Sequence, residues 1–228
     1  MEQFLSALPA TLIQGLIYAL ISLGVYITYS ILDFPDLGVD GTFPLGAAVT
    51  AVLLTKGVSP WLTLPIAMGV GALAGLFTGF IHVRLKVRDL LAGIITMTGL
   101  FSINLQIAGS NLTIERSTDT IFSSRADLAL CGDMTLTGRK ILVSLVLVLA
   151  VKLGMDAYFR TKSGLLLRAV GDNASLVTTL AMDRGRMKIL GLAISNALVA
   201  LAGCIVCHES RSFSATMGTG QLVYGLAA

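Results

Sequence analysis

The chain has 228 residues, of which 55% are hydrophobic and only 13% are charged, and its mean hydropathy is +0.85. Soluble domains carry roughly 25% charged residues, and a core of this size cannot hide so much apolar surface from water. We therefore expect lipid to surround much of the chain. The net charge of +3 comes without a basic stripe and interleaved aromatic residues, which excludes nucleic acid as an expected partner.

Apolar runs follow one another along the chain, and most approach the roughly 20 residues that a membrane span needs. They cover residues 8–32, 42–55, 61–85, 90–109, 141–158 and 189–207, and a last run begins near Gln221. We expect one domain over residues 1–228, built as an all-α polytopic transmembrane bundle of six to seven spans. The second span is short or broken. The last run is too short to span a membrane before Ala228, so we expect the whole protein to continue beyond it.

Basic residues indicate the orientation, because lysine and arginine accumulate on the cytoplasmic side of a membrane. They fill the links 84–88 and 160–188, and the alternation of spans puts both links on one side. The loop 109–140 on the opposite side mixes acidic and basic residues. We therefore place both basic links in the cytoplasm and the N-terminus outside.

The link after the first run is acidic and irregular, reading DFPDLGVDGTFP from Asp33. Broken helices in transporters mark polar backbone inside the bilayer around a cavity. One interpretation is a discontinuous helix along a solute route, with Asp33, Asp36 and Asp40 partly buried. The other is an ordinary exposed turn whose aspartates cap the next helix. The small residues 46–48 suit tight packing against a neighbouring helix and favour the first interpretation.

The order of long helix, irregular link and short glycine-rich segment occurs twice, at residues 8–48 and 189–228. The two leading helices would cross the membrane in opposite directions. Inverted repeats of this kind are typical of transporters, and chance similarity between apolar segments is the alternative.

No motif for covalent chemistry stands out. The sequence lacks the GxxxxGK[ST] phosphate loop, so it does not predict ATP hydrolysis by this chain. Residues 204–208 match the CxxCH pattern of haem attachment, but small cysteines three residues apart in an apolar helix fit buried packing better. We expect no catalytic residue, no metal site and no cofactor.

Polar residues inside membrane spans are costly and therefore need a role. Asn104 and Asn196 are the clearest examples. They either line a polar route or hydrogen-bond neighbouring helices, and the sequence leaves both roles open.

The longer basic link contains a further helical segment. Gly171-Asp172-Asn173 predicts a turn whose Asp or Asn caps a following helix. Residues 174–182 would form that helix, with Leu176, Val177, Leu180 and Ala181 on its apolar face. Such a helix either rests on the lipid surface or inserts into a groove on a soluble partner, and its short face of small residues favours the groove.

Several blocks of this sequence resemble permeases of ABC importers for branched-chain amino acids and ribose, including the tryptophan/tyrosine-type branch. The blocks are GLIYALISLGV from Gly15, FPDLGVDGTFPLGAA from Phe34, GLLLRAVGDNA from Gly164, LAMD from Leu180 and MKILGLAISNALVALAG from Met187. Family members often carry proline after Gly-Asp-Asn, where Ala174 stands here, and that departure affects the details of docking on a partner.

The resemblance implies a permease subunit of the bacterial plasma (inner) membrane that works with other chains. These partners are a cytosolic ATP-binding subunit, a second permease copy in a homodimer, and an extracytoplasmic solute-binding protein. It also implies a cytoplasmic coupling helix that docks on the ATPase, and a solute route in the core. The coupling residues would be Gly171, Asp172, Asn173, Ala174, Val177, Leu180, Ala181, Met182 and Asp183. The route would include Asp33, Asp36, Asp40, Gly41, Thr42 and Phe43, and Asn104 and Asn196 are expected to join it.

The expected mechanism is alternating access, in which ATP hydrolysis on the partner rocks two permease halves about a central cavity that holds a small solute, such as an amino acid. The alternative is a self-sufficient secondary transporter or channel. That alternative predicts membrane-embedded charges for ion coupling, for which the three aspartates of the acidic link are the candidates. A purely structural scaffold would not need the broken helix.

Overall fold

The computed structural model describes residues 2–123, 136–172 and 183–227, and most of these residues are helical. In chain order the elements are α1 (Glu2–Tyr26), the π-helical turn η1 (Ile27–Ile31), α2 (Val39–Thr55), α3 (Pro60–Arg84), α4 (Asp89–Ala108), β1 (Asn111–Thr113), α6 (Leu136–Phe159), α7 (Lys162–Asp172), α9 (Arg184–Ser210), β2 (Ser212–Ser214) and α10 (Gln221–Ala227).

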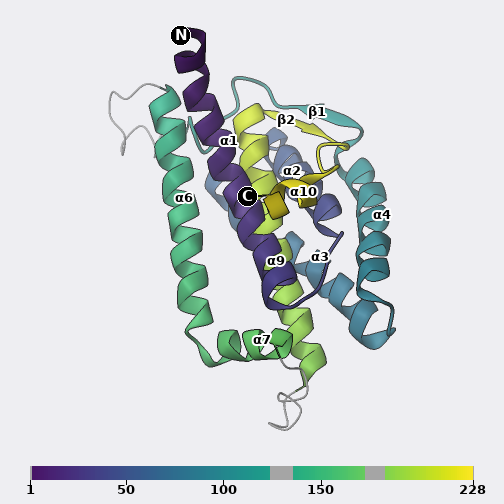
Figure 1. The fold of residues 1–228 in the computed structure, drawn as a ribbon. Helices are drawn as coiled ribbons and strands as arrows, with labels where there is room; N and C mark the ends of the chain where they lie inside the picture. The colour runs from purple at the N-terminus through teal and green to yellow at the C-terminus, as the bar shows by residue number, and fades with distance from the viewer. Residues whose placement is uncertain (1, 124–135, 173–182, 228) are drawn as a thin grey trace.

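Five helices in the described part of the chain are long and apolar enough to cross a membrane, and α2 is a shorter apolar helix of 17 residues. Each long helix begins and ends within a few residues of the apolar run that predicted it. The expected all-α transmembrane bundle with a short second span is therefore confirmed. Figure 1 shows the long helices packed side by side, with α7 lying across one end.

Local signals set the helix boundaries. Pro60 occupies the first position of α3, where its missing N–H costs nothing. Gly109 ends α4 at a φ of 70°, a conformation that glycine adopts readily. Asp183 precedes α9, and its carboxylate accepts a hydrogen bond from the backbone N–H of Gly185 at 2.9 Å.

Helix α9 forms the centre of the bundle. It is the most deeply buried of the long helices and packs against α1, α2 and α3. Glycines make these approaches close: a side chain at Gly46 of α2 would strike the backbone of Ala200, and one at Gly75 of α3 would strike that of Leu192. The tight packing predicted for residues 46–48 is confirmed.

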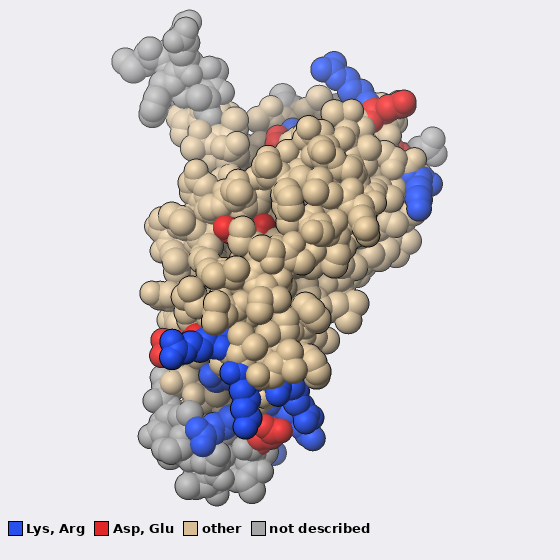
Figure 2. Space-filling view, turned by 90° about the vertical axis from the view of Figure 1, so that its right-hand side faces the viewer, with Lys and Arg blue, Asp and Glu red and all other residues tan. Residues whose placement is uncertain are grey.

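The outer faces of the bundle are apolar. Large side chains remain exposed on α3, α4 and α6, among them Leu73, Phe77, Leu91, Ile103, Val146 and Leu153. Figure 2 shows most charged residues toward the two ends of the molecule. The broad region between these ends is almost free of charged residues and shows only a few acidic atoms at mid-height. Such a region suits the hydrocarbon core of a bilayer.

The link 84–88 and the described parts of the link 160–188 lie at the same end of the bundle, away from the N-terminus (Figure 1). This arrangement agrees with the predicted alternation of spans. The positive-inside rule then assigns this end to the cytoplasm. We call it the basic end.

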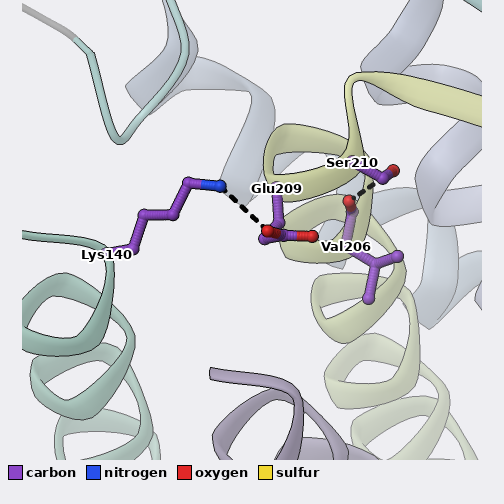
Figure 3. A network of polar contacts seen from close by, with 4 residues as sticks. All are labelled: Lys140, Val206, Glu209 and Ser210. Carbon is purple, nitrogen blue, oxygen red and sulfur yellow. Dashed lines mark hydrogen bonds and ion pairs between the residues drawn. The ribbon is translucent and has the colours of Figure 1, made fainter. Parts of the chain in front are cut away.

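At the opposite end, a strand pair, hydrogen bonds and an ion pair connect segments that are distant in the sequence. Strands β1 and β2, which the sequence did not predict, pair antiparallel. Arg211 adopts a left-handed conformation, and its guanidinium donates to the carbonyls of Glu115, Arg116 and Thr118. The ammonium of Lys140 on α6 lies 2.9 Å from a carboxylate oxygen of Glu209 on α9 (Figure 3).

The internal repeat expected from the sequence has a counterpart in the packing. The first unit is α1 with η1, a break, and α2, and the second is α9, a loop carrying β2, and α10. Helix α1 packs against α10, as α9 packs against α2, and the two long helices run in opposite directions.

Candidate functional site

The first membrane helix ends in a π-helical turn that leads into the break. Leu32 donates to the carbonyl of Ile27, and Phe34 donates to that of Thr28, so the helix ends at these residues. Asp33 follows with a φ of 50° and is exposed to the surroundings of the molecule. The expectation that Asp33 is partly buried is therefore wrong, because the left-handed backbone turns it outward while Phe34 fills the core.

Asp36 lies in the interior of the bundle, with 1% of its surface exposed. One carboxylate oxygen accepts the backbone N–H of Gly38 at 2.8 Å, and the other accepts the side-chain amide of Asn196 at 2.8 Å. The first contact is a local turn that starts α2. Asp36 is therefore buried, as the first interpretation of the acidic link expected, and it forms the turn before α2 without capping that helix.

Asn196 of α9 has every hydrogen-bonding atom engaged. Its amide nitrogen donates to Asp36 and to the carbonyl of Leu192, and its oxygen accepts the hydroxyl of Thr42 at 2.7 Å. We call Asp36, Thr42 and Asn196 the closed cluster. Because an asparagine side chain offers two donors and one carbonyl acceptor, this residue bonds neighbouring segments and has no free donor for a ligand.

Helix α2 begins three residues earlier than the sequence indicated, at Val39 instead of Thr42. Asp40 and Gly41 therefore belong to its first turn and not to an irregular link. The carboxylate of Asp40 reaches across to the second unit, where it accepts the backbone N–H groups of Gly220 at 3.1 Å and Leu222 at 2.9 Å. One side chain of α2 thus caps the start of α10.

Asn104 of α4 meets the other face of α2. Its amide nitrogen donates to the carbonyl of Gly41 at 3.2 Å, which joins the two helices. Its side-chain oxygen is buried and has no hydrogen-bond partner among the residues that the structure describes. Asn104 is therefore only half satisfied, although it is fully buried.

A small cavity of about 150 Å³ opens beside Asn104, between α2, α4 and the loop before α10. We call it the Asn104 cavity. Its lining residues are Asp40, Gly41, Pro44, Met97, Thr98, Phe101, Asn104, Ala215 and Thr219. Asp40 is thus the acidic residue among mostly apolar or small residues that line this cavity.

The structure divides the residues proposed for the solute route into separate groups. Asp40, Gly41 and Asn104 line the Asn104 cavity, whereas Asp36, Thr42 and Asn196 form the closed cluster. Phe43 belongs to neither group, because its ring is buried in the central apolar core.

On the α4 side of this cavity, the sequence predicted Asn104 but not its neighbours Met97, Thr98 and Phe101. Met97, Phe101 and Asn104 are spaced by four and three residues, so they lie on one face of a helix. That spacing around a polar residue was the available signal. The contributions of Ala215 and Thr219 could not be read from the sequence, because they come from a loop more than 100 residues further along the chain.

At the basic end, α7 lies across the bundle and joins α6 to the segment before α9 (Figure 1). Gly171 and Asp172 form the last residues of α7, so the predicted turn at these positions is wrong. Gly171 lies so close to η1 that a side chain at this position would strike the carbonyl of Ile31. Asn173, Ala174, Val177, Leu180, Ala181 and Met182 lie outside the described residues, and Asp183 caps α9.

The CxxCH residues lie inside the bundle. Cys204 and Cys207 are free and buried in α9, and His208 lies 2.8 Å from the hydroxyl of Thr63 on α3 through its Nε2 atom. Their positions on one buried helix agree with the packing role expected for them.

These features define a multi-pass membrane protein in which two short helices start inside the bundle. The family described as "Branched-chain amino acid transport system / permease component" matches residues 8–228. The chain therefore belongs to this family of ABC transporter permeases. It is a membrane permease subunit, and a multi-pass protein of the bacterial inner membrane.

Proteins similar to this chain are named for different solutes. The tyrosine transport system permease protein of Clostridioides difficile is 38% identical over 224 residues, which cover 98% of this chain and 72% of that protein. The ribose import permease protein RbsC of Haemophilus influenzae is 28% identical over 219 residues, covering 94% and 65% respectively. The probable branched-chain amino acid permease LivH of Methanocaldococcus jannaschii is 27% identical over 216 residues, covering 92% and 68%. No solved structure matches the chain.

Proposed function

We propose that the chain is the membrane-spanning part of an ABC importer that moves an amino acid inward by alternating access, driven by a separate ATPase subunit. A second copy of the chain would form the other half of the pathway, and an extracytoplasmic binding protein would deliver the solute. The amino acid class is supported by the relative named as a tyrosine permease and by the relative named for branched-chain amino acids.

One observation carries the proposal: the basic end is packed directly onto the break in the first membrane helix. Leu167 and Val170 of α7 are buried, and Gly171 rests on the carbonyl of Ile31. Ile31 belongs to η1, and η1 leads into the break that holds Asp36. A push on α7 therefore has a short, packed route to the start of α2.

Residues 173–182 are the proposed contact with the ATPase. Their two flanks, α7 and the start of α9, both lie at the basic end (Figure 1). A partner that binds this segment would act on both flanks at once. Because both flanks pack against η1, such a partner could bias the two states of the break.

The test is ATP-dependent uptake of labelled amino acids in cells that express the chain together with its neighbouring transport genes. Leu180→Arg should abolish co-purification of the ATPase and reduce uptake to background, because it places a charge on the apolar face predicted for the coupling helix. Leu85→Arg is the matched control: Leu85 is exposed in the other basic link, and the same change should leave ATPase binding intact. Retained binding in Leu180→Arg would contradict the assigned contact.

The rival function, a self-sufficient secondary transporter or channel, makes a different prediction. Asp36 is a buried carboxylate without a cationic partner among the described residues, and such groups occur in ion-coupled carriers. Uptake by that route would continue when the ATPase gene is deleted and would stop when the proton gradient is collapsed. Uptake that depends on ATP and survives an uncoupler supports the importer.

A further inference from the structure

We propose that a groove on the outer face of α1, closed at the basic end by Arg168 of α7, binds an anionic phospholipid of the cytoplasmic leaflet. This inference goes beyond the proposed function and does not depend on it, because it requires neither a solute nor an ATPase. The groove consists of two neighbouring hollows that share Tyr26 and Ser30. We call them together the α1 groove.

The larger hollow is mostly apolar and has a volume of about 390 Å³. It lies between α1 with η1 and α10, and Leu23, Val25 and Leu226 are among its lining residues. From Ser22 to Ser30 the helix rises about 12 Å, which approaches the depth of one leaflet in a hydrocarbon core of about 30 Å. This part of the α1 groove therefore suits an acyl chain of one leaflet.

The smaller hollow, of about 180 Å³, has mainly polar walls. Tyr26, Ser30, Ile31 and Arg168 line it. Hydroxyl and guanidinium groups are hydrogen-bond donors, and no acidic residue is among the described residues that line this hollow. Its composition favours an anionic group that accepts hydrogen bonds and disfavours a cation.

The guanidinium of Arg168 is held against the protein. Its Cζ atom lies over the ring of Phe159, 4.9 Å from the ring centroid, and Phe159 is buried. Stacking uses the face of a guanidinium and leaves the N–H groups at its edge available. None of the ion pairs within the described ranges involves Arg168. An oriented guanidinium without an acidic partner is suited to a phosphate, which it can bind through two parallel hydrogen bonds.

The α1 groove lies at the depth that such a lipid requires. Helix α7 crosses the basic end of the bundle (Figure 1), which the positive-inside rule assigns to the cytoplasm. Tyr26 and Tyr29 are 46% and 54% exposed there, and tyrosine is enriched where a membrane meets water. Basic pockets between membrane helices on this side bind anionic headgroups. The polar hollow is thus at the headgroup level, and the apolar hollow runs from it along α1 toward the middle of the bilayer.

Only an amphiphile uses both hollows. A free anion would occupy the polar hollow and leave the apolar one without a partner, and an apolar helix would leave the guanidinium of Arg168 without one. A zwitterionic lipid also carries a phosphate, but its cation would lie among the exposed basic residues Arg160 and Lys162 of the same link. The α1 groove therefore favours a phospholipid with net negative charge.

The test uses the purified full chain in a neutral detergent, with native mass spectrometry to count and titrate bound molecules. The probes are dioleoyl-phosphatidylglycerol, dioleoyl-phosphatidylcholine, dihexanoyl-phosphatidylglycerol and inorganic phosphate. The dioleoyl glycerol lipid should bind about tenfold more tightly than the choline lipid, because one charge-assisted contact distinguishes them. The short-chain lipid and inorganic phosphate should bind weakly, because they leave the apolar hollow unfilled.

Variants in one link assign the binding to the α1 groove. Arg168→Gln should weaken binding of dioleoyl-phosphatidylglycerol by about tenfold, because the contact with the phosphate is lost. Arg168→Lys keeps the charge but not the planar pair of donors, so its affinity should fall between the two. Arg160→Gln is the matched control, since Arg160 is an exposed cation of the same link outside the lining of both hollows, and it should bind normally. Because Arg168 is exposed, all three variants should unfold at the temperature of the unchanged protein when lipid is absent.

Several results would overturn the proposal. They are no retained lipid, equal affinity for the glycerol and choline lipids, unchanged affinity in Arg168→Gln, or an equal loss in Arg160→Gln, which would indicate general attraction to the basic end. Displacement of the lipid by an equal concentration of inorganic phosphate would also contradict it, because the apolar hollow would then contribute nothing. The result is independent of any measurement of uptake.

Discussion

Two buried asparagines contact opposite faces of α2, and they differ in how many of their hydrogen-bonding atoms are engaged. Toward α9, Asn196 donates to Asp36 just before α2 and to the carbonyl of Leu192 in its own helix, and its oxygen accepts from Thr42 of α2. Toward α4, Asn104 donates once and keeps an oxygen without a partner among the described residues, beside a cavity. The same residue type thus serves as a structural tie on one face and as an open group on the other. The number of hydrogen-bond partners of a polar residue in a membrane helix therefore indicates its role.

The largest expected effect on stability comes from removing the hydrogen bonds of Asn196. Asn196→Leu should lower the free energy of unfolding by about 3 kcal/mol, because the buried Asp36 carboxylate loses a donor, while Thr42 keeps the carbonyl of Gly38 as an acceptor. Unfolding by SDS titration of the purified chain measures it. The double variant with Asp36→Leu should recover part of the loss, since the orphaned carboxylate is then gone. A strictly additive double variant would show that the two residues do not interact.

The next largest effect on stability is expected where glycines of α2 pack against α9 and against α4. A side chain at Gly46 would meet the backbone of Ala200 on α9, whereas one at Gly41 would meet Met97 of α4 at 3.0 Å. Gly46→Ala should therefore cost about 2 kcal/mol, and Gly41→Ala should cost less. Gly69→Ala, where a methyl group would meet open space, is the control and should cause no loss. Thermal unfolding in detergent compares the three, and equal costs for Gly46 and Gly41 would remove the contrast.

A smaller change in stability is expected at the open asparagine. Asn104→Leu should cost only about 1 kcal/mol, since one hydrogen bond to Gly41 is lost while an orphaned oxygen is removed with it. The same SDS titration measures this value, which should be well below that of Asn196→Leu. If the two variants are equally destabilised, Asn104 is a structural tie as well.

The smallest effect is expected at the outer end of α9. The Lys140–Glu209 pair joins α6 to α9 but remains about 30% exposed on both sides (Figure 3). Lys140→Met should cost about 0.5 kcal/mol, because water competes for partly exposed charges. Thermal unfolding at low and high salt checks it, and the difference from the unchanged protein should shrink as salt is added. A loss as large as that of Asn196→Leu would contradict this ranking.

The spans, their order and the short second span could be predicted from the sequence, because hydropathy and helix length depend on local composition. The roles of the two asparagines could not, because both are single polar residues in apolar helices. Only the positions of Gly41, Asp36 and Thr42 in space reveal which atoms are engaged.

The structure contradicts two expectations that were drawn from local residue types. Gly171-Asp172 has the composition of a turn, but these residues end α7, where Gly171 lies close to the carbonyl of Ile31. Asp33 was expected to share the environment of Asp36, but a left-handed backbone turns it outward. In both places a tertiary contact or a backbone angle overrides what the local residue types favour.

The hydrogen bonds of α2 also imply an order of assembly. The partners of its first residues lie further along the chain by 63 positions for Asn104, 154 for Asn196 and 180 for Gly220. At a ribosomal rate of about 5–20 residues per second, Asp40 is made roughly 10–40 s before the backbone groups that its carboxylate will cap. Of these three hydrogen-bond partners of α2, Asn104 is synthesised first, and the groups that bind the Asp40 carboxylate are synthesised last.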